Sequence, residues 1–249
     1  DPTLQLPDHL LRSIFSYLKC QDLIHVSLVS KNWHRNTPSY FALDFDESLF
    51  FENIPNKSLP DVQKSHSNFL DWIHSSLETC KIRLSKAEKR ILRIQFNHSE
   101  NIYDLMRLID ENNFHESTCL TILHLTRCAL EEQIFYSEEK FDSLQELKLD
   151  GVELSGETLS KFISKCPSIR ELSLVNCNLL WRIVLPKLDS LKKLCVKLNT
   201  YHYITNIQVI APSLQVFHFV YSSLKQDAVN MDIRACRMLR EFHLDCLKF

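Results

Sequence analysis

Residues 144–152 read LQELKLDGV, and residues 169–177 read IRELSLVNC. Both stretches carry apolar residues at positions 1, 4 and 6, so they share the template apolar-x-x-apolar-x-apolar. In an extended strand alternate side chains point to opposite faces, which places positions 4 and 6 together on one face. The template therefore predicts a short strand with one apolar and one polar face, used more than once.

The same template recurs at regular intervals through most of the chain. The first residues of its seven copies are Ile91, Leu120, Leu144, Ile169, Leu191, Leu214 and Leu239. Successive copies start 29, 24, 25, 22, 23 and 25 residues apart, which matches the roughly 20–29-residue period of leucine-rich repeats. In such a solenoid each unit adds one strand to a parallel sheet on the concave face, while helices and loops cover the convex face. We therefore expect an α/β fold in which residues 91–249 form leucine-rich repeats.

The ninth position of each unit is a further test, because leucine-rich repeats favour Asn or Cys there. This position holds, in order, Ser99, Cys128, Val152, Cys177, Asn199, Ser222 and Leu247. The chain has nine cysteines, an odd number with no C-x-x-C pair, which argues for reduced thiols in an intracellular protein. We therefore interpret Cys128 and Cys177 as buried repeat residues and not as nucleophiles.

The region 39–90 is less regular and precedes the repeats. Residues 40–45 fit the strand template, which favours an atypical first repeat. Helical spacing of apolar residues predicts a helix over 61–80 that packs on and caps the first repeats, with the chain returning at Ile82. Between two later strands, residues 156–164 also have a helix-like composition.

The start of the chain carries a helical pattern. Residues 6–33 read LPDHLLRSIFSYLKCQDLIHVSLVSKNW. Apolar residues recur with helical spacing over 10–18, after a Pro-Asp pair suited to the first turn of a helix. A second segment starts near Asp22, and Ser30 is placed to cap a third short helix that carries Trp33. A module of about 36 residues cannot bury two such faces alone, so part of this apolar surface must meet the rest of the chain or a partner.

The order Leu-Pro-Asp, Leu-Leu, Ile-Phe-Ser, Asp-Leu, Val-Ser and Trp in this run resembles the F-box, a helical module that docks a Skp-type adaptor. The Cys-Pro-Ser and Ala-Pro-Ser-Leu lead-ins to two strands resemble plant F-box proteins with leucine-rich repeats. The resemblance implies that residues 1–38 form a three-helix F-box that binds the adaptor and, through it, a cullin scaffold. The adaptor-binding residues that it implies are Leu6, Pro7, Leu10, Ile14, Leu18, Leu23, Val29 and Trp33.

The resemblance also implies a function, which is substrate recognition within an SCF-type (Skp–cullin–F-box) ubiquitin ligase. Such a subunit is not an enzyme, because the F-box docks the adaptor while the repeats hold an unknown protein substrate for ubiquitination. Two alternatives share this architecture, a ligand-dependent hormone co-receptor and an interaction scaffold that works without a ligase. The expected location is the cytoplasm, the nucleus or both.

Composition narrows the classes of partner. The formal net charge is −2 over 249 residues, and no apolar run approaches the roughly 20 residues of a membrane helix, so we expect neither nucleic acid nor membrane. Gly151 and Gly156 are the only glycines, too few for a Gly-rich phosphate-binding loop. We expect no metal and no cofactor, with one alternative taken from some plant hormone receptors of this class. That alternative is an inositol phosphate held by Lys187, Lys192, Lys193 and Lys197.

Positions 3, 5 and 7 of each unit should face the concave surface, where a substrate could dock. The candidate contact residues are Glu146, Lys148, Glu171, Ser173, Lys193, Lys197, His218 and His243. Acidic units flank a basic unit at Lys193 and Lys197, which favours a partner of mixed charge. The last unit has no cap, so either the native chain continues beyond Phe249 or the last strand is an exposed edge.

Overall fold

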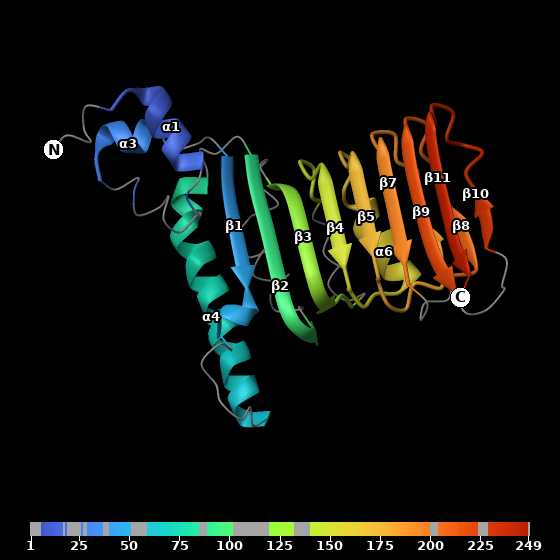
Figure 1. Ribbon diagram of the computed structural model, residues 1–249, viewed down its shortest axis with the longest axis horizontal. Helices are drawn as coiled ribbons and strands as arrows, with labels where there is room; N and C mark the ends of the chain where they lie inside the picture. Colours follow the sequence, from blue (N-terminus) through green and yellow to red (C-terminus); the bar gives the residue numbers. More distant parts are fainter. Residues whose placement is uncertain are drawn as a thin grey trace.

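The structure of the protein is a computed structural model, and the ranges it describes are 6–16, 18, 26, 29–36, 40–50, 59–84, 89–101, 120–131, 140–199, 204–223 and 229–248. Within these ranges, an eight-stranded parallel sheet forms the body of the molecule (Figure 1). Its strands, in spatial order, are β1 (Tyr40–Asp46), β2 (Lys89–Asn101), β3 (Leu120–Ala129), β4 (Glu146–Asp150), β5 (Glu171–Val175), β7 (Lys193–Leu198), β9 (Val216–Ser223) and β11 (Glu241–Lys248). Each repeat pairs with the next, which confirms the predicted α/β solenoid of leucine-rich repeats.

A second layer covers one face of this sheet. It contains helix α6 (Gly156–Ser164) and a three-stranded parallel sheet of β6 (Arg182–Val184), β8 (Asn206–Gln208) and β10 (Asn230–Asp232). Figure 1 shows α6, β8 and β10 behind the eight-stranded sheet. The helix expected over 156–164 is confirmed, and Ser155 caps it by accepting a hydrogen bond from the Thr158 amide at 3.0 Å.

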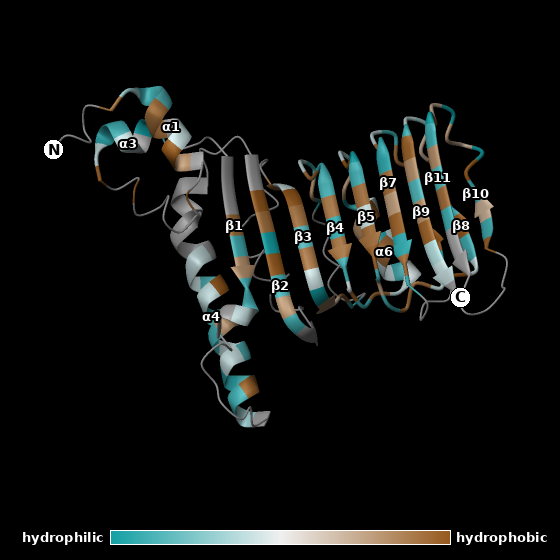
Figure 2. Ribbon diagram, in the orientation of Figure 1, coloured by the Kyte–Doolittle hydropathy of each residue, from teal (hydrophilic) through white to brown (hydrophobic). Residues whose placement is uncertain are grey.

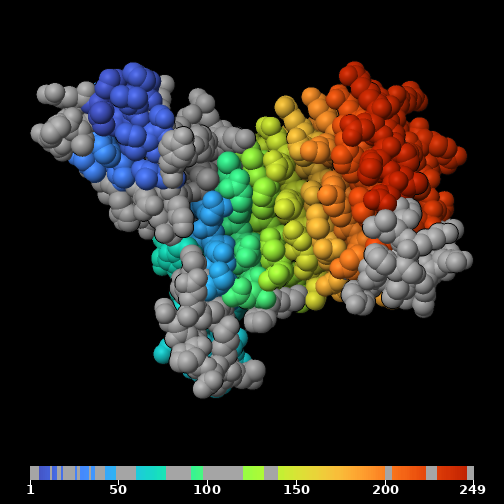
Figure 3. All heavy atoms as spheres, viewed as in Figure 1, coloured from blue at the N-terminus to red at the C-terminus, as the bar shows by residue number. Residues whose placement is uncertain are grey.

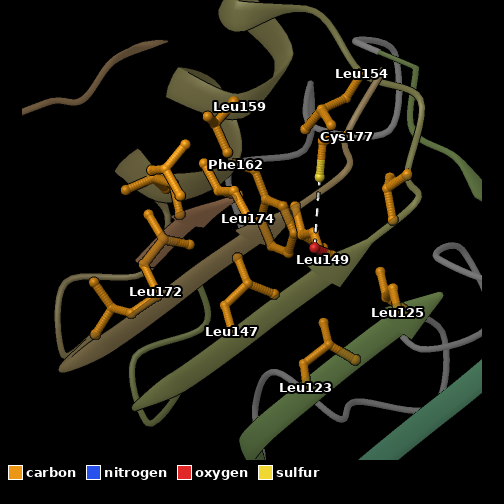
Figure 4. Close-up of a cluster of buried hydrophobic side chains, with 14 of the residues drawn as sticks. Leu123, Leu125, Leu147, Leu149, Leu154, Leu159, Phe162, Leu172, Leu174 and Cys177 are labelled. Atoms are coloured by element: carbon orange, nitrogen blue, oxygen red, sulfur yellow. Dashed lines mark hydrogen bonds between the residues drawn. The ribbon is translucent and has the colours of Figure 1, made fainter. Parts of the chain in front are cut away.

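The core lies between the two layers and consists of two rows of aligned apolar side chains. Parallel pairing places position 4 of each unit beside position 4 of the next, and the same holds for position 6. Figure 4 shows part of these rows pointing toward α6. The buried rows are Leu123, Leu147, Leu172, Leu194 and Phe217 at position 4, and Leu125, Leu149, Leu174, Val196 and Phe219 at position 6. Full burial of each such side chain contributes about 1.5–3 kcal/mol, so the rows dominate the stability of the solenoid.

Along the strands, hydrophobic and hydrophilic residues alternate (Figure 2), so the opposite face of the sheet is polar. We call this surface the outer face, and it carries positions 3, 5 and 7 of the units. Figure 3 shows it as one continuous surface from β1 to β11. The assignment of these positions to the face away from the core is therefore confirmed for the central strands.

The register predicted for the first unit is wrong by two residues. We assigned Ile94 to position 4, but Ile94 pairs with Leu125 at position 6, while Leu92 pairs with Leu123 at position 4. The run ILRIQF offers apolar residues in two frames two residues apart, and pairing with the neighbouring strands selects one of them. Because the side-chain period of a strand is two, the faces were still assigned correctly.

Helix α4 (Leu59–Leu84) covers the first repeats, as expected for a capping segment. Phe69 and Ile73 are fully buried, and the Phe69 ring packs edge-on against Phe96 of β2 with centroids 5.6 Å apart. The helix is longer than the predicted 61–80, because it continues through Ile82 instead of turning back there. β1 pairs in register with β2, so residues 40–46 contribute the first strand of the sheet.

Buried Glu47 lies in the short 3-10 helix η2 (Glu47–Phe50) and connects it to both α4 and β2. One carboxylate oxygen, Oε1, lies 2.8 Å from His66 Nδ1 of α4, and Oε2 accepts a hydrogen bond of 2.7 Å from the Asn97 amide of β2. Both oxygens of this buried carboxylate thus have partners, which offsets the free-energy cost of removing it from water.

At the other end, β11 is the edge of the sheet, and its core-side positions stay exposed. The side chains of Phe242 and Leu244 are 43% and 54% exposed, whereas the aligned Phe217 and Phe219 one strand inward are buried. The rule that positions 4 and 6 enter the core therefore fails for this unit, which among the described residues has a neighbouring strand of the sheet on one side only.

The cysteines at repeat positions are packing residues. Cys128 and Cys177 are fully buried, and the Cys177 thiol donates to the Leu149 carbonyl at 3.5 Å, the dashed line in Figure 4. Burial raises the pKa of the Cys177 thiol from 9.0 to about 12 and raises the pKa of Cys128 further. Because their pKa is raised in the folded protein, these thiols stay protonated there at a pH at which they would already ionise in the unfolded chain. Their contribution to stability is therefore complete below pH 9 and is lost as pH rises toward 12.

We predict that Leu147→Ala lowers the free energy of unfolding by about 2–5 kcal/mol, because Leu147 lies in the buried position-4 row. Lys148→Ala, one residue further along the same strand and on the outer face, should change it by no more than about 0.5 kcal/mol. Urea denaturation of both variants and of the wild type measures this difference. Equal losses for the two variants would contradict the assignment of the two faces.

We also predict unequal thiol reactivity at pH 8. The thiolate is the reactive form, so partly exposed Cys195 should be alkylated by iodoacetamide at least about tenfold faster than buried Cys177 or Cys128. Peptide mapping by mass spectrometry follows each site separately, and the same reaction in concentrated urea serves as the control in which the rates should converge. Fast alkylation of Cys177 in the folded protein would show that it is not a packing residue.

Candidate functional site

Helix α1 (Asp8–Ser16) presents two different apolar surfaces. Leu11 and Phe15 are fully buried, whereas Leu10 and Ile14 are 43% and 44% exposed. Residues four apart in a helix lie one turn apart on the same face, so Leu10 and Ile14 form a continuous exposed strip. The wide apolar face seen in the sequence is thus divided between a small local core and a surface available to a partner.

The local core is held by helix α3 (Lys31–Asn36). The Trp33 ring packs edge-on against Phe15 with centroids 5.5 Å apart. Asn36, which is buried, donates from Nδ2 to the Asp8 carboxylate at 2.9 Å, joining the ends of the two helices. Ser30 accepts a hydrogen bond from the Trp33 amide at 3.2 Å, so its predicted role as a cap is confirmed.

These two helices have a hydrophobic cluster of their own, separate from the core of the solenoid. Figure 1 shows them at one end of the molecule, next to α4. Exposed Leu10 and Ile14 therefore lie outside both cores that are seen in the described residues.

The other residues predicted to bind an adaptor differ in exposure. Pro7 and Val29 are exposed, Leu6, Leu18 and Trp33 are partly buried around the local core, and Leu23 lies outside the described residues. The Pro7 carbonyl accepts hydrogen bonds from Leu10 and Leu11, so it starts α1 as the sequence suggested. Contact with an adaptor stays a prediction for the whole set.

The outer face of the sheet brings charged side chains of neighbouring strands into pairs. Glu146 Oε1 lies 2.7 Å from His124 Nε2, Lys193 Nζ lies 3.7 Å from Glu171, and Glu241 Oε1 lies 2.8 Å from His218 Nε2. Most of these side chains are at least one-third exposed, so each pair contributes at most about 1 kcal/mol. These contacts occupy several of the polar side chains on this face.

The predicted substrate residues lie on this face in three parallel rows. Position 3 holds Glu146, Glu171 and Lys193, position 5 holds Lys148, Ser173, His218 and His243, and position 7 holds Lys197. Lys148 lies 3.8 Å from Asp150, and the ring of His243 packs against that of His218. Lys197 is exposed and forms no ion pair with any residue that the structure describes. Substrate contact by these residues stays a prediction.

The four lysines considered for an inositol phosphate differ in their surroundings. Lys187 pairs with Asp189 at 3.0 Å and Lys193 with Glu171, while Lys192 and Lys197 are exposed. Lys193 and Lys197 are four residues apart on one strand, which separates their Cα atoms by roughly 13 Å. Two of the four thus already face a carboxylate, and anion binding here stays a prediction.

Sequence reasoning missed one exposed apolar site. Leu179 and Trp181 lie between β5 and β6, outside the repeat template, and their side chains are 57% and 66% exposed. The available signal was a Leu-Leu-Trp run that neither strand template nor helical spacing accounted for.

The described part of the chain offers no group of three potential metal ligands. None of its helices is long and apolar enough to cross a membrane.

Comparison with known proteins gives two matches to family models. Residues 3–41 match the model described as F-box-like, and residues 73–246 match the LRR domain of the At1g61320/AtMIF1 type. The second match covers well over half of the chain. Together the two matches reproduce the order of modules seen in the structure.

Several curated relatives from Arabidopsis thaliana have the same architecture in their names. The chain is 26% identical to putative F-box/LRR-repeat protein At3g42770, over 68% of this chain and 35% of that protein. It is 25% identical to putative F-box/LRR-repeat protein At5g02930, over 85% of this chain and 46% of that protein. It is 24% identical to F-box/LRR-repeat protein At3g58900, over 92% of this chain and 75% of that protein.

The chain thus spans less than half the length of two of these relatives. Its exposed helical strip falls within the region matched by the F-box-like model, and the solenoid from β2 onward falls almost entirely within the region matched by the LRR model. The chain belongs to the family of F-box proteins with leucine-rich repeats.

Proposed function

We propose that this protein is the substrate-recognition subunit of an SCF-type ubiquitin ligase. The observation that carries the proposal is the exposed strip of Leu10 and Ile14 on α1, in a module that matches the F-box-like family. Two large apolar side chains of one helix remain in water although buried Leu11 and Phe15 lie beside them. Burying the strip against a Skp-type adaptor would remove this apolar surface from water, at about 25 cal/mol per Å².

The proposed role needs no reacting group on this chain. The α1 strip would bind the adaptor, and the adaptor would bind a cullin scaffold that carries a ubiquitin-charged conjugating enzyme. A substrate held on the repeats would then present its lysines to that enzyme at an effective concentration far above the bulk value. Ubiquitin transfer would be promoted by proximity alone. The solenoid would contribute by being rigid, because a rigid solenoid keeps the bound substrate at a fixed distance from the F-box.

The outer face is the proposed surface for the protein substrate. Several of its polar and charged side chains already contact a neighbour within the sheet, so a partner must match individual positions. Lys197, which is free of such a pair among the described residues, offers a carboxylate of the substrate a direct contact. We place this function in the cytoplasm or the nucleus, where ubiquitin ligases of this type act.

The test replaces the exposed strip while keeping the local core. We predict that Leu10→Ala with Ile14→Ala lowers the affinity for a purified Skp-type adaptor about 100-fold, since each truncation removes about 1.4 kcal/mol or more of interface burial. The matched control is His9→Ala, an exposed residue on another side of α1, which should bind as the wild type does. Isothermal titration calorimetry measures the three affinities, and circular dichroism checks that α1 and the sheet stay folded.

Two results would contradict the proposal. One is adaptor binding by the double variant with an affinity equal to that of the His9→Ala control. The other is an adaptor-bound wild-type chain that fails to bring the cullin into the complex, since this would leave an interaction scaffold without a ligase. Recovery of the cullin with the wild type and its loss with the double variant is the expected outcome.

A further inference from the structure

A cavity of about 610 Å³ opens on the second layer, between the first turn of α6 and β6. Its apolar walls are Leu179, Trp181 and Val184, and its charged rim residues are Glu157 and Arg182. Ile183, between Arg182 and Val184, points into the core and is fully buried, so its two neighbours on the strand point the other way, toward the cavity. This site is distinct from both the α1 strip and the outer face of the sheet.

The backbone that carries the cavity walls is held in place by several hydrogen bonds. The Trp181 carbonyl accepts from the Thr205 amide at 2.9 Å and from the Thr205 hydroxyl at 3.1 Å. Arg182 pairs in register with Asn206 of β8. On the other side, Gly156 packs directly on the Arg182 carbonyl, so closely that any Cβ at this position would collide with it. The absence of a side chain on Gly156 therefore allows the start of α6 to approach β6 this closely.

Two features of the segment 179–181 are unfavourable for the stability of the fold, namely backbone strain and exposed apolar surface. Leu179 has a left-handed backbone conformation with φ of 65°, which costs a residue with a Cβ about 1 kcal/mol or more. Leu179 and Trp181 also leave large apolar side chains mostly in water, and neither contributes to the core. Strain combined with exposed apolar surface is characteristic of a binding site, because the fold itself gains nothing from either.

The openness of the walls indicates the class of ligand. Pockets for small molecules usually bury 70–90% of the ligand, which walls as exposed as Leu179 and Trp181 do not provide. Trp and Arg are instead the residue types enriched at the energetic centres of protein–protein interfaces. A polypeptide segment is therefore the occupant that this cavity fits best.

Charge complementarity defines the segment further. Arg182 is exposed and forms no ion pair with any residue that the structure describes, so its guanidinium is available to a carboxylate. Glu157 on the α6 side of the rim disfavours a second acidic group there. We propose that this cavity binds a protein segment in which a bulky apolar side chain fills the space between Leu179 and Trp181 and an adjacent acidic residue pairs with Arg182. This proposal does not depend on the ligase function.

The experiment uses a phage-displayed library of random heptapeptides, selected on the full chain in the absence of any adaptor. We expect enrichment of peptides with an aromatic or branched apolar residue next to Asp or Glu. A synthetic peptide of the enriched sequence should lose at least tenfold in affinity for Trp181→Ala, measured by fluorescence polarisation. The matched control is Met238→Ala, which truncates another exposed apolar side chain outside the cavity and should leave the affinity unchanged.

A charge reversal tests the acidic contact. Arg182→Glu should weaken binding of the acidic peptide at least tenfold and should restore binding when the acidic residue of the peptide is replaced by Lys. Arg237→Glu, an equal change of charge at an exposed site outside the cavity, is the control that should do neither. Thermal unfolding of all four variants should match the wild type, because none of the replaced side chains is buried.

Three results would overturn the proposal. The first is a selection that enriches no peptide whose binding depends on Trp181. The second is an enriched peptide that binds Arg182→Glu as tightly as the wild type. The third is a dimer of the chain that forms in sedimentation experiments and is abolished by Trp181→Ala, since a second copy would then be the occupant.

Discussion

Pairing of all repeat strands in a single parallel register is the constraint on which the rest of the molecule depends. Adjacent strands lie roughly 4.8 Å apart, so aligned units stack Leu123, Leu147 and Leu172 into one row without gaps. A slip by one residue would turn the row to solvent and bring charged residues inward. The same register aligns the ion pairs of the outer face and positions the second layer. The core, the outer face and the cavity beside Trp181 therefore all depend on the parallel pairing of the strands.

The sequence was sufficient for this architecture because its pattern repeats, and repetition makes each unit a check on the others. The register of β2 is a feature that the repeating pattern could not predict. Ile91, Ile94 and Phe96 fit the template in one frame, whereas Leu92 and Ile94 fit positions 4 and 6 of a frame that starts two residues earlier. Only pairing with both neighbouring strands selects the second frame. Long-range pairing of this kind is not encoded within the nine residues of one unit. The exposed positions of β11 show the same limit, since the template places Phe242 and Leu244 in the core but cannot tell what packs against them.

The candidate sites were less predictable for a related reason. A run such as Leu10, Leu11, Ile14 and Phe15 predicts an apolar helix, but which half is buried depends on where Trp33 packs. The cavity beside Trp181 depends on the approach of α6 to β6, two segments whose contact requires Gly156. Sequence patterns predict individual helices and strands, whereas binding sites form where helices and strands from different repeat units meet. Residues outside the repeat template therefore deserve a search of their own in solenoid proteins.

The α1 strip and the outer face are separate surfaces, which agrees with the proposal that one binds an adaptor and the other a substrate. The α1 strip belongs to a module with its own small hydrophobic cluster, so an adaptor could bind it without disturbing the solenoid core. The outer face and the Trp181 cavity lie on different layers of the sheet stack, so two segments could occupy them together. If one protein partner bridged both, linkage would multiply two modest affinities, provided that its connecting segment could reach around the edge of the sheet.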